Sequence, residues 1–234
     1  MNFNLQNLFG MLSKPEVLVD PATFNDPLAI KTSWESAKKG GANFRTHEAV
    51  QVNGNRLEFR PTTIYSLVPY MVLFMGLGMP VFAGMIRYMN DKNLVFDKTM
   101  LLMIGIAVIF GGGSYFVFRA VRAAIVFDKS YGYFWKGKRD QQGQAFNPAE
   151  QKESVRLSDI HALQIIYEWV RSGGKNNTQY RSYELNLVLS SGERLNVIDH
   201  GNRAALLIDA NMLAQFLSVP LWDRTEAKAV VLKC

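Results

Sequence analysis

The three histidines, His47, His161 and His200, have the side chains in this sequence that most often act as metal ligands or general bases. None of them stands in a His-x-x-x-His pattern or in a Cys/His cluster, so a metal site is not indicated. Asp199 precedes His200, but a turn into a following helix explains that pair more simply. Residues 111–114 read Gly-Gly-Gly-Ser without the lysine of a phosphate-binding loop. We therefore expect no catalytic residue, cofactor or metal, and no enzymatic activity.

One stretch combines aromatic and basic side chains. Tyr133 and Trp135 are followed by Lys136, Lys138 and Arg139. Near an anionic leaflet, each basic residue contributes about 1 kcal/mol of attraction. These five residues are our candidate membrane-surface or partner contact. The competing interpretation is that the charges only set the membrane topology.

The elements that would position this stretch are two long uncharged runs. Residues 61–86 and 99–118 contain no charged side chain, and the polar piece between them has twelve residues. A bilayer core of about 30 Å needs roughly 20 apolar residues of helix. The sequence therefore predicts transmembrane helices over 64–86 and 99–119. Because the runs contain no ionisable residue, a channel or proton relay is not favoured.

Small residues in both runs predict close helix packing. Gly76 and Gly78 lie near each other in the first run, and Ala107 and Gly111 have small-xxx-small spacing in the second. Packing of the two helices on each other is the simpler interpretation. A dimer seam or a substrate path is the alternative.

Basic residues around the runs predict the orientation. Nine lie on the side of the two termini within the flanking segments, against three in the connecting turn. Cytoplasmic segments carry this excess, so we expect a two-span inner-membrane protein with both termini in the cytoplasm. The nine are Arg45, Arg56, Arg60, Arg119, Arg122, Lys129, Lys136, Lys138 and Arg139; the three are Arg87, Lys92 and Lys98.

The segments before the first run divide into two parts. Residues 1–41 should hold a short amphipathic helix over 2–13, an irregular proline-containing stretch, and a short helix from about 31 that ends at Gly40-Gly41. Residues 42–60 should hold a β-hairpin, with strands over 48–52 and 56–59. Asn53-Gly54-Asn55 would supply the positive φ angles of its turn.

After the second run the apolar period changes to two, which predicts strands. We expect them over 124–127, 131–135, 154–157, 160–170, 183–189 and 194–198, with a turn at 190–193. An apolar stripe then predicts a helix over 202–217, with Asn202 as its N-cap. Residues 223–234 are a tail.

The strand order, the hairpin ending in Gly-Glu-Arg and the closing helix that runs into Phe-Leu-Ser-Val-Pro-Leu-Trp (216–222) resemble bacterial pleckstrin-homology-like (PH-like) domains. The resemblance covers about 120–222 plus the 42–60 hairpin. It implies an α+β membrane protein in which a two-helix hairpin carries an antiparallel β-barrel or sandwich capped by a C-terminal helix. We further expect the strand at 56–59 to pair with strands after the second span, which makes the membrane hairpin an insertion within a β-domain.

Charge and cysteine content bound the partners. The net charge is +6, but residues 123–234 hold 14 basic and 12 acidic residues, so no basic face for nucleic acid is indicated. Cys234 is the single cysteine and excludes an intrachain disulfide. We expect a non-enzymatic membrane protein that presents a PH-like domain to a protein partner or to itself. The alternatives are an immunity protein against a membrane-acting toxin, and an accessory subunit of a membrane enzyme or transporter.

Overall fold

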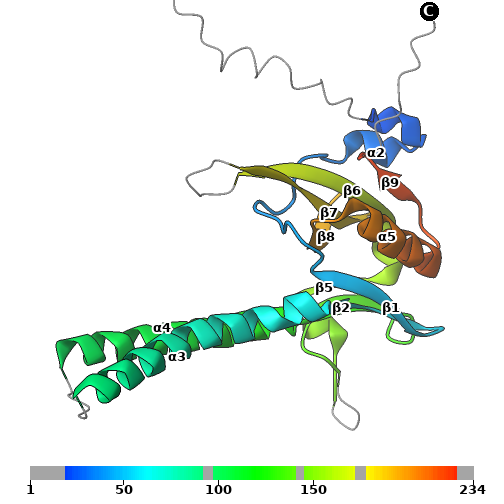
Figure 1. Cartoon of the computed structure of the whole chain (residues 1–234). Helices are drawn as coiled ribbons and strands as arrows, with labels where there is room; N and C mark the ends of the chain where they lie inside the picture. The colour runs from blue at the N-terminus through cyan, green and yellow to red at the C-terminus, as the bar shows by residue number, and fades with distance from the viewer. Residues whose placement is uncertain (1–18, 92–96, 141–144, 172–177, 226–234) are drawn as a thin grey trace, which may run out of the picture. The chain divides into compact units, whose positions relative to one another are not determined.

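A computed structural model describes residues 19–91, 97–140, 145–171 and 178–225 (Figure 1). The chain forms two compact units. Unit 1 combines residues 1–44 with residues 158–234, and unit 2 comprises residues 45–157. Unit 2 is therefore inserted into unit 1. The expected helix over 2–13 and most of the expected tail lie outside the described residues.

Unit 2 is built on a five-stranded antiparallel sheet with the order β1-β2-β3-β4-β5. Its strands are β1 (His47–Asn53), β2 (Arg56–Pro61), β3 (Ala124–Asp128), β4 (Tyr133–Gly137) and β5 (Glu153–Arg156). The hairpin of β1 and β2 confirms the expected one. Its turn is held by the Asn53 side chain, which accepts a hydrogen bond from the Asn55 amide at 2.9 Å, and not by positive φ angles.

Two long helices separate β2 from β3, although these strands are neighbours in the sheet. Phe59 lies opposite Ile125, and Leu57 lies opposite Phe127. Helices α3 (Thr63–Asp91) and α4 (Lys98–Val121) run between them. The expected pairing across the two runs is thus present, and the helix pair forms the connection of a β-hairpin.

Helices α3 and α4 lie side by side along their length (Figure 1). A Cβ atom added at Gly76 would come within 2.3 Å of Phe110 Cβ, so only glycine allows this approach. The buried Ser114 hydroxyl donates to the Pro69 carbonyl at 2.7 Å. Gly78 and Gly111 do not have this role, because an added Cβ there meets no atom closer than 3.8 Å.

Apart from this mutual contact, the two helices leave their apolar side chains uncovered. Phe74 is 78% exposed and Ile109 is 71% exposed. Only 11% of the most apolar stretch of α3 and 6% of that of α4 are buried. A core helix of a water-soluble protein would be mostly buried, so these helices have the length and surface of membrane-spanning segments.

Unit 1 contains a four-stranded sheet with the order β8-β7-β6-β9. Strands β6 (Ile160–Arg171), β7 (Gln179–Leu189) and β8 (Arg194–His200) are antiparallel, and β9 (Leu221–Asp223) pairs with β6 in parallel. Helix α5 (Arg203–Leu217) begins after Asn202, whose side chain accepts a hydrogen bond from the Ala205 amide. The predicted β7–β8 hairpin and closing helix are both confirmed. Short helices η1 (Pro21–Phe24) and α2 (Pro27–Lys31) precede this sheet in the chain.

One expectation for the N-terminal segment is wrong. The helix predicted from about residue 31 is absent, since α2 ends at Lys31 and residues 32–41 run as an irregular strap. The backbone amides of Ala37 and Lys38 donate to the buried Glu184 carboxylate, and those of Gly40 and Gly41 donate to Glu168. These backbone amides therefore donate to side chains of strands β6 and β7, and not to carbonyl groups within a helix.

Unit 2 also contains the short helix η2 (Pro148–Glu150), and the short helix η3 (Leu157–Asp159) crosses the boundary between the two units. Neither sheet closes into a barrel, so the barrel form of the expected β-domain is wrong. The residues expected to form one domain over 120–222 divide between the two units at residue 157. What the structure shows is a mixed α+β protein with two open sheets and a pair of long apolar helices.

Candidate functional site

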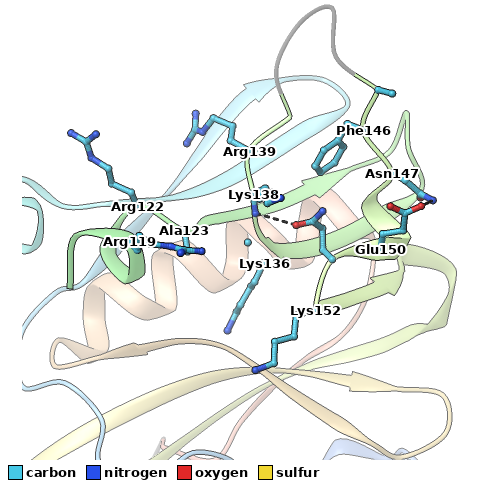
Figure 2. Close-up of a pocket in the computed structure, with 13 residues that line it drawn as sticks. Arg119, Arg122, Ala123, Lys136, Lys138, Arg139, Phe146, Asn147, Glu150 and Lys152 are labelled. Atoms are coloured by element: carbon cyan, nitrogen blue, oxygen red, sulfur yellow. Dashed lines mark hydrogen bonds between the residues drawn. The ribbon is translucent and has the colours of Figure 1, made fainter. Parts of the chain in front are cut away.

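A cavity of about 630 Å³ lies in unit 2 where α4 ends (Figure 2). Its walls come from the last turn of α4, the end of β4, the loop after β4, and the segment around η2. Six of the side chains that line it are basic and one is acidic. The basic residues are Arg119, Arg122, Lys136, Lys138, Arg139 and Lys152; the acidic residue is Glu150.

The end of α4 supplies two of the cations directly after its apolar run. Arg122 caps the helix, with its amide donating to the Phe118 carbonyl at 3.1 Å. Its guanidinium lies 3.8 Å from the centre of the Phe118 ring, which is a cation–π contact. Arg119, one turn earlier, is exposed. Cations in the last turn also interact favourably with the helix dipole.

The loop after β4 is shaped by a positive φ at Gly137 and held by two hydrogen bonds. Gly137 has a φ of 139°, and a Cβ there would come within 2.9 Å of Gln151 Oε1. The same Gln151 oxygen accepts a hydrogen bond from the Lys138 amide at 3.1 Å (Figure 2). On the other side, Trp135 Nε1 donates to the Lys138 carbonyl at 3.1 Å. The Lys138 backbone is therefore fixed from both sides while its side chain stays exposed.

Two of the six cations have carboxylate partners. Lys136 lies 3.5 Å from Glu153, and Arg139 lies 3.4 Å from the buried Glu58. Within the described ranges, the other four cations have no carboxylate within 4.0 Å. The single acid of the wall, Glu150, accepts a hydrogen bond from Asn147. The four unneutralised cations are Arg119, Arg122, Lys138 and Lys152.

A partly buried ion network stands behind Arg139. Arg56 donates to both oxygens of Asp140, at 2.7 and 2.5 Å, and to Glu58 at 2.9 Å. The hydrogen bond from Arg56 holds the pKa of the Asp140 carboxyl below its usual value. Burial alone would raise the pKa of Glu58, but hydrogen bonds from Arg60 and Arg56 outweigh burial and lower it. Glu58 and Asp140 therefore stay ionised at neutral pH.

This arrangement is suited to binding an anion. Guanidinium and ammonium groups form charge-assisted hydrogen bonds with phosphate and carboxylate oxygens. The cavity volume falls in the range of small-ligand sites, about 300–1,000 Å³.

The structure brings together three of the five predicted contact residues. Lys136, Lys138 and Arg139 line the cavity, whereas Tyr133 and Trp135 do not. The Trp135 side chain is fully buried, so it is not a membrane-surface contact, and its place in the sheet explains why. Trp135 packs on Ala124 and Val126 of β3, and its Nε1 holds the loop after β4 by a hydrogen bond to the Lys138 carbonyl.

Sequence reasoning missed the other half of the basic wall. Arg119, Arg122 and Lys152 come from segments separated by a β-hairpin and a loop, and only the fold places them beside Lys138. The signal available was that Arg119 and Arg122 follow an apolar run directly.

The histidines lie apart from this cavity. His47 packs edge-on against Tyr65, and His161 Nε2 lies 2.7 Å from Asp26 Oδ2, within hydrogen-bond distance. His200 is fully buried, and its Nδ1 accepts a hydrogen bond from the Asn202 amide at 2.9 Å. Among the described residues no group of three His, Cys, Asp or Glu side chains is placed to hold a metal ion.

No protein-family model matches the chain, and no curated protein or solved structure is similar to it.

Proposed function

We propose that this chain is a non-enzymatic integral membrane protein of the bacterial inner membrane. Helices α3 and α4 cross the bilayer, both termini lie in the cytoplasm, and the two sheet units stand at the cytoplasmic surface. There they bind another protein or a second copy of the chain.

The observation that carries this proposal is the insertion of two exposed apolar helices between adjacent strands. Because β2 and β3 pair directly, the helix pair leaves the sheet at the end of β2 and returns at the adjacent start of β3. Basic side chains at the end of α4, Arg119 and Arg122, then mark a cytoplasmic boundary. A sheet joined in this way is held at the bilayer surface by two covalent links.

The likeness to bacterial PH-like domains is part of the proposal. Its support is the element order: antiparallel strands, the β7–β8 hairpin and a closing amphipathic helix, α5. Exposed strand edges and loops of such domains suit protein docking.

Topology is tested with single cysteines in whole bacterial cells. In a Cys234→Ser background, Asn90→Cys near the outer end of α3 should react with a membrane-impermeant maleimide added outside. The otherwise unchanged chain with Cys234 should react only after the cells are permeabilised. The reverse pattern, or extraction of the chain from membranes by alkaline carbonate, would overturn the proposal.

Partner binding is tested by amine-reactive cross-linking of the full chain in intact membranes, followed by mass spectrometry. We expect one defined cross-linked species, with lysines of the two sheet units joined to a second protein or to another copy. The matched control adds the same reagent after detergent has dispersed the membrane. A chain that stays uncross-linked in both samples would argue against a docking function.

A further inference from the structure

We propose that the basic cavity at the end of α4 is a binding site for a phosphate-bearing anion. The ligand is either the headgroup of an anionic phospholipid or a soluble phosphate. This inference goes one step beyond the proposed function, since it assigns a ligand to a site. Only the lipid form of it rests on the proposed membrane insertion.

The first argument is the excess of positive charge. Arg119, Arg122, Lys138 and Lys152 have no carboxylate partner within the described part of the chain, although they surround one cavity. Like charges held close together repel, so their convergence is unfavourable until an anion enters.

The second argument is that the loop is preorganised. The Lys138 backbone is fixed by Gln151 on one side and by the buried Trp135 on the other. Glu58 similarly fixes Arg139, while leaving half of that side chain exposed. A site whose cations are already in place loses less entropy on binding than a flexible one.

The third argument is the depth of the site. No charged residue occurs over 99–118, and Arg119 is the first cation after that run. With α4 in a bilayer, the cavity opens at the level of the lipid phosphates. Basic side chains at the end of a transmembrane helix reach that level and contact anionic headgroups.

The choice of phosphate over carboxylate follows from the number and type of donors. Four guanidinium and ammonium groups carry four positive charges, of which one carboxylate offsets a single charge, whereas a phosphate offers three or more acceptor oxygens and up to two negative charges. Guanidinium groups also match phosphate geometry in a bidentate manner. A volume of about 630 Å³ admits a phosphate together with a small headgroup.

The test is calorimetric titration of the full chain in a neutral detergent with three probes. These are dihexanoyl phosphatidylglycerol, inorganic pyrophosphate and phosphate-free dihexanoylglycerol. The variant Lys138→Gln/Lys152→Gln removes two cations of the wall. The matched control, Lys31→Gln/Lys39→Gln, makes the same change in net charge at exposed residues outside the cavity.

We expect the unaltered chain and the control to bind at least one phosphate probe and not dihexanoylglycerol. The cavity variant should bind about 25-fold more weakly, since each of its two lost basic residues contributes a factor of about five. Lys138→Arg/Lys152→Arg should restore binding, which separates loss of charge from loss of fold. Binding of the lipid alone identifies a headgroup site, and binding of pyrophosphate alone identifies a soluble phosphate.

Equal binding by the cavity variant and the control, or no binding of either phosphate probe, would overturn the inference. The pyrophosphate titration needs no membrane, so it remains valid if the topology experiment fails. Conversely, a correct topology with no phosphate binding would remove the site and leave the proposed function standing.

Discussion

At the scale of single residues, the most consequential group is Arg56. It lies in β2, it is partly buried, and it bonds Asp140, Glu58 and Asp128. It also lies 5.6 Å from the centre of the Trp135 ring. One guanidinium thus joins strands β2 and β3 to the start of the loop that carries the cavity's cations.

This network predicts a specific acid sensitivity. Because the pKa of Asp140 is lowered in the folded state, its ion pair stabilises the protein above the unfolded pKa of about 3.9. That contribution is lost as the pH falls through the lower folded value. Asp140→Asn should therefore cost about 2 kcal/mol at neutral pH, and its thermal midpoint should fall less than that of the unaltered chain between about pH 5 and pH 3.

The measurement is thermal unfolding in detergent across that pH range. Glu48→Gln is the control, because the Arg45–Glu48 pair at 3.5 Å is largely exposed and contributes little. Parallel pH curves for Asp140→Asn and the unaltered chain would contradict the prediction.

At the scale of elements, the close packing of the two apolar helices depends on one glycine, Gly76. Gly76 lets α3 approach Phe110 of α4, and Ser114 hydrogen-bonds the Pro69 carbonyl within the same interface. Without a hydrophobic driving force between helices in lipid, such close contacts and hydrogen bonds decide how the pair packs.

Gly76→Ala should lower the stability of the helix pair. The added methyl group overlaps Phe110, and overpacking of this kind costs about 1–3 kcal/mol. We expect a thermal midpoint several degrees lower in detergent. Gly84→Ala in the same helix meets no atom within 4 Å and should leave the midpoint unchanged or raise it. Equal midpoints for the two variants would show that the helices do not pack as described.

The elements themselves were largely readable from the sequence, because their signals are local. Uncharged runs, a two-residue period and the turn at Gly192 placed the helices and most strands within a few residues. The strap over 32–41 was not readable. Its amides are satisfied by Glu184 and Glu168, which lie more than a hundred residues further along the chain. Only part of the cavity's basic wall could be predicted, for the same reason. Lys138 belongs to the stretch over 133–139 that the sequence singles out, whereas Arg119 comes from a separate segment.

At the scale of the whole molecule, the pair of apolar helices forms the connection between the adjacent strands β2 and β3, so it should be replaceable. Phe59 and Ile125 are paired, Arg60 follows Phe59 on β2, and Ala124 precedes Ile125 on β3. Replacing residues 61–123 with Asn-Gly should close β2 onto β3 with the register kept. We expect this shortened chain to be recovered without detergent and to unfold cooperatively.

A matched join tests the register. Replacing residues 60–123 with the same Asn-Gly places Phe59 opposite Ala124, and a slip of one residue turns the apolar side chains of a strand to the wrong face. That variant should aggregate. Similar solubility and melting for both joins, measured by circular dichroism, would contradict the register.

The nesting of segments, with the helix pair inside unit 2 and unit 2 inside unit 1, also sets an order in time. The ribosome delivers the strap and β2 long before their partners, Glu184 and β3, exist. Strand β2 waits until both helices have emerged and, in the proposed membrane topology, have entered the bilayer. The strap over 32–41 waits longer still, until its partners Glu168 and Glu184 have been synthesised. The segments in the middle of the chain therefore complete their contacts before the segments that enclose them.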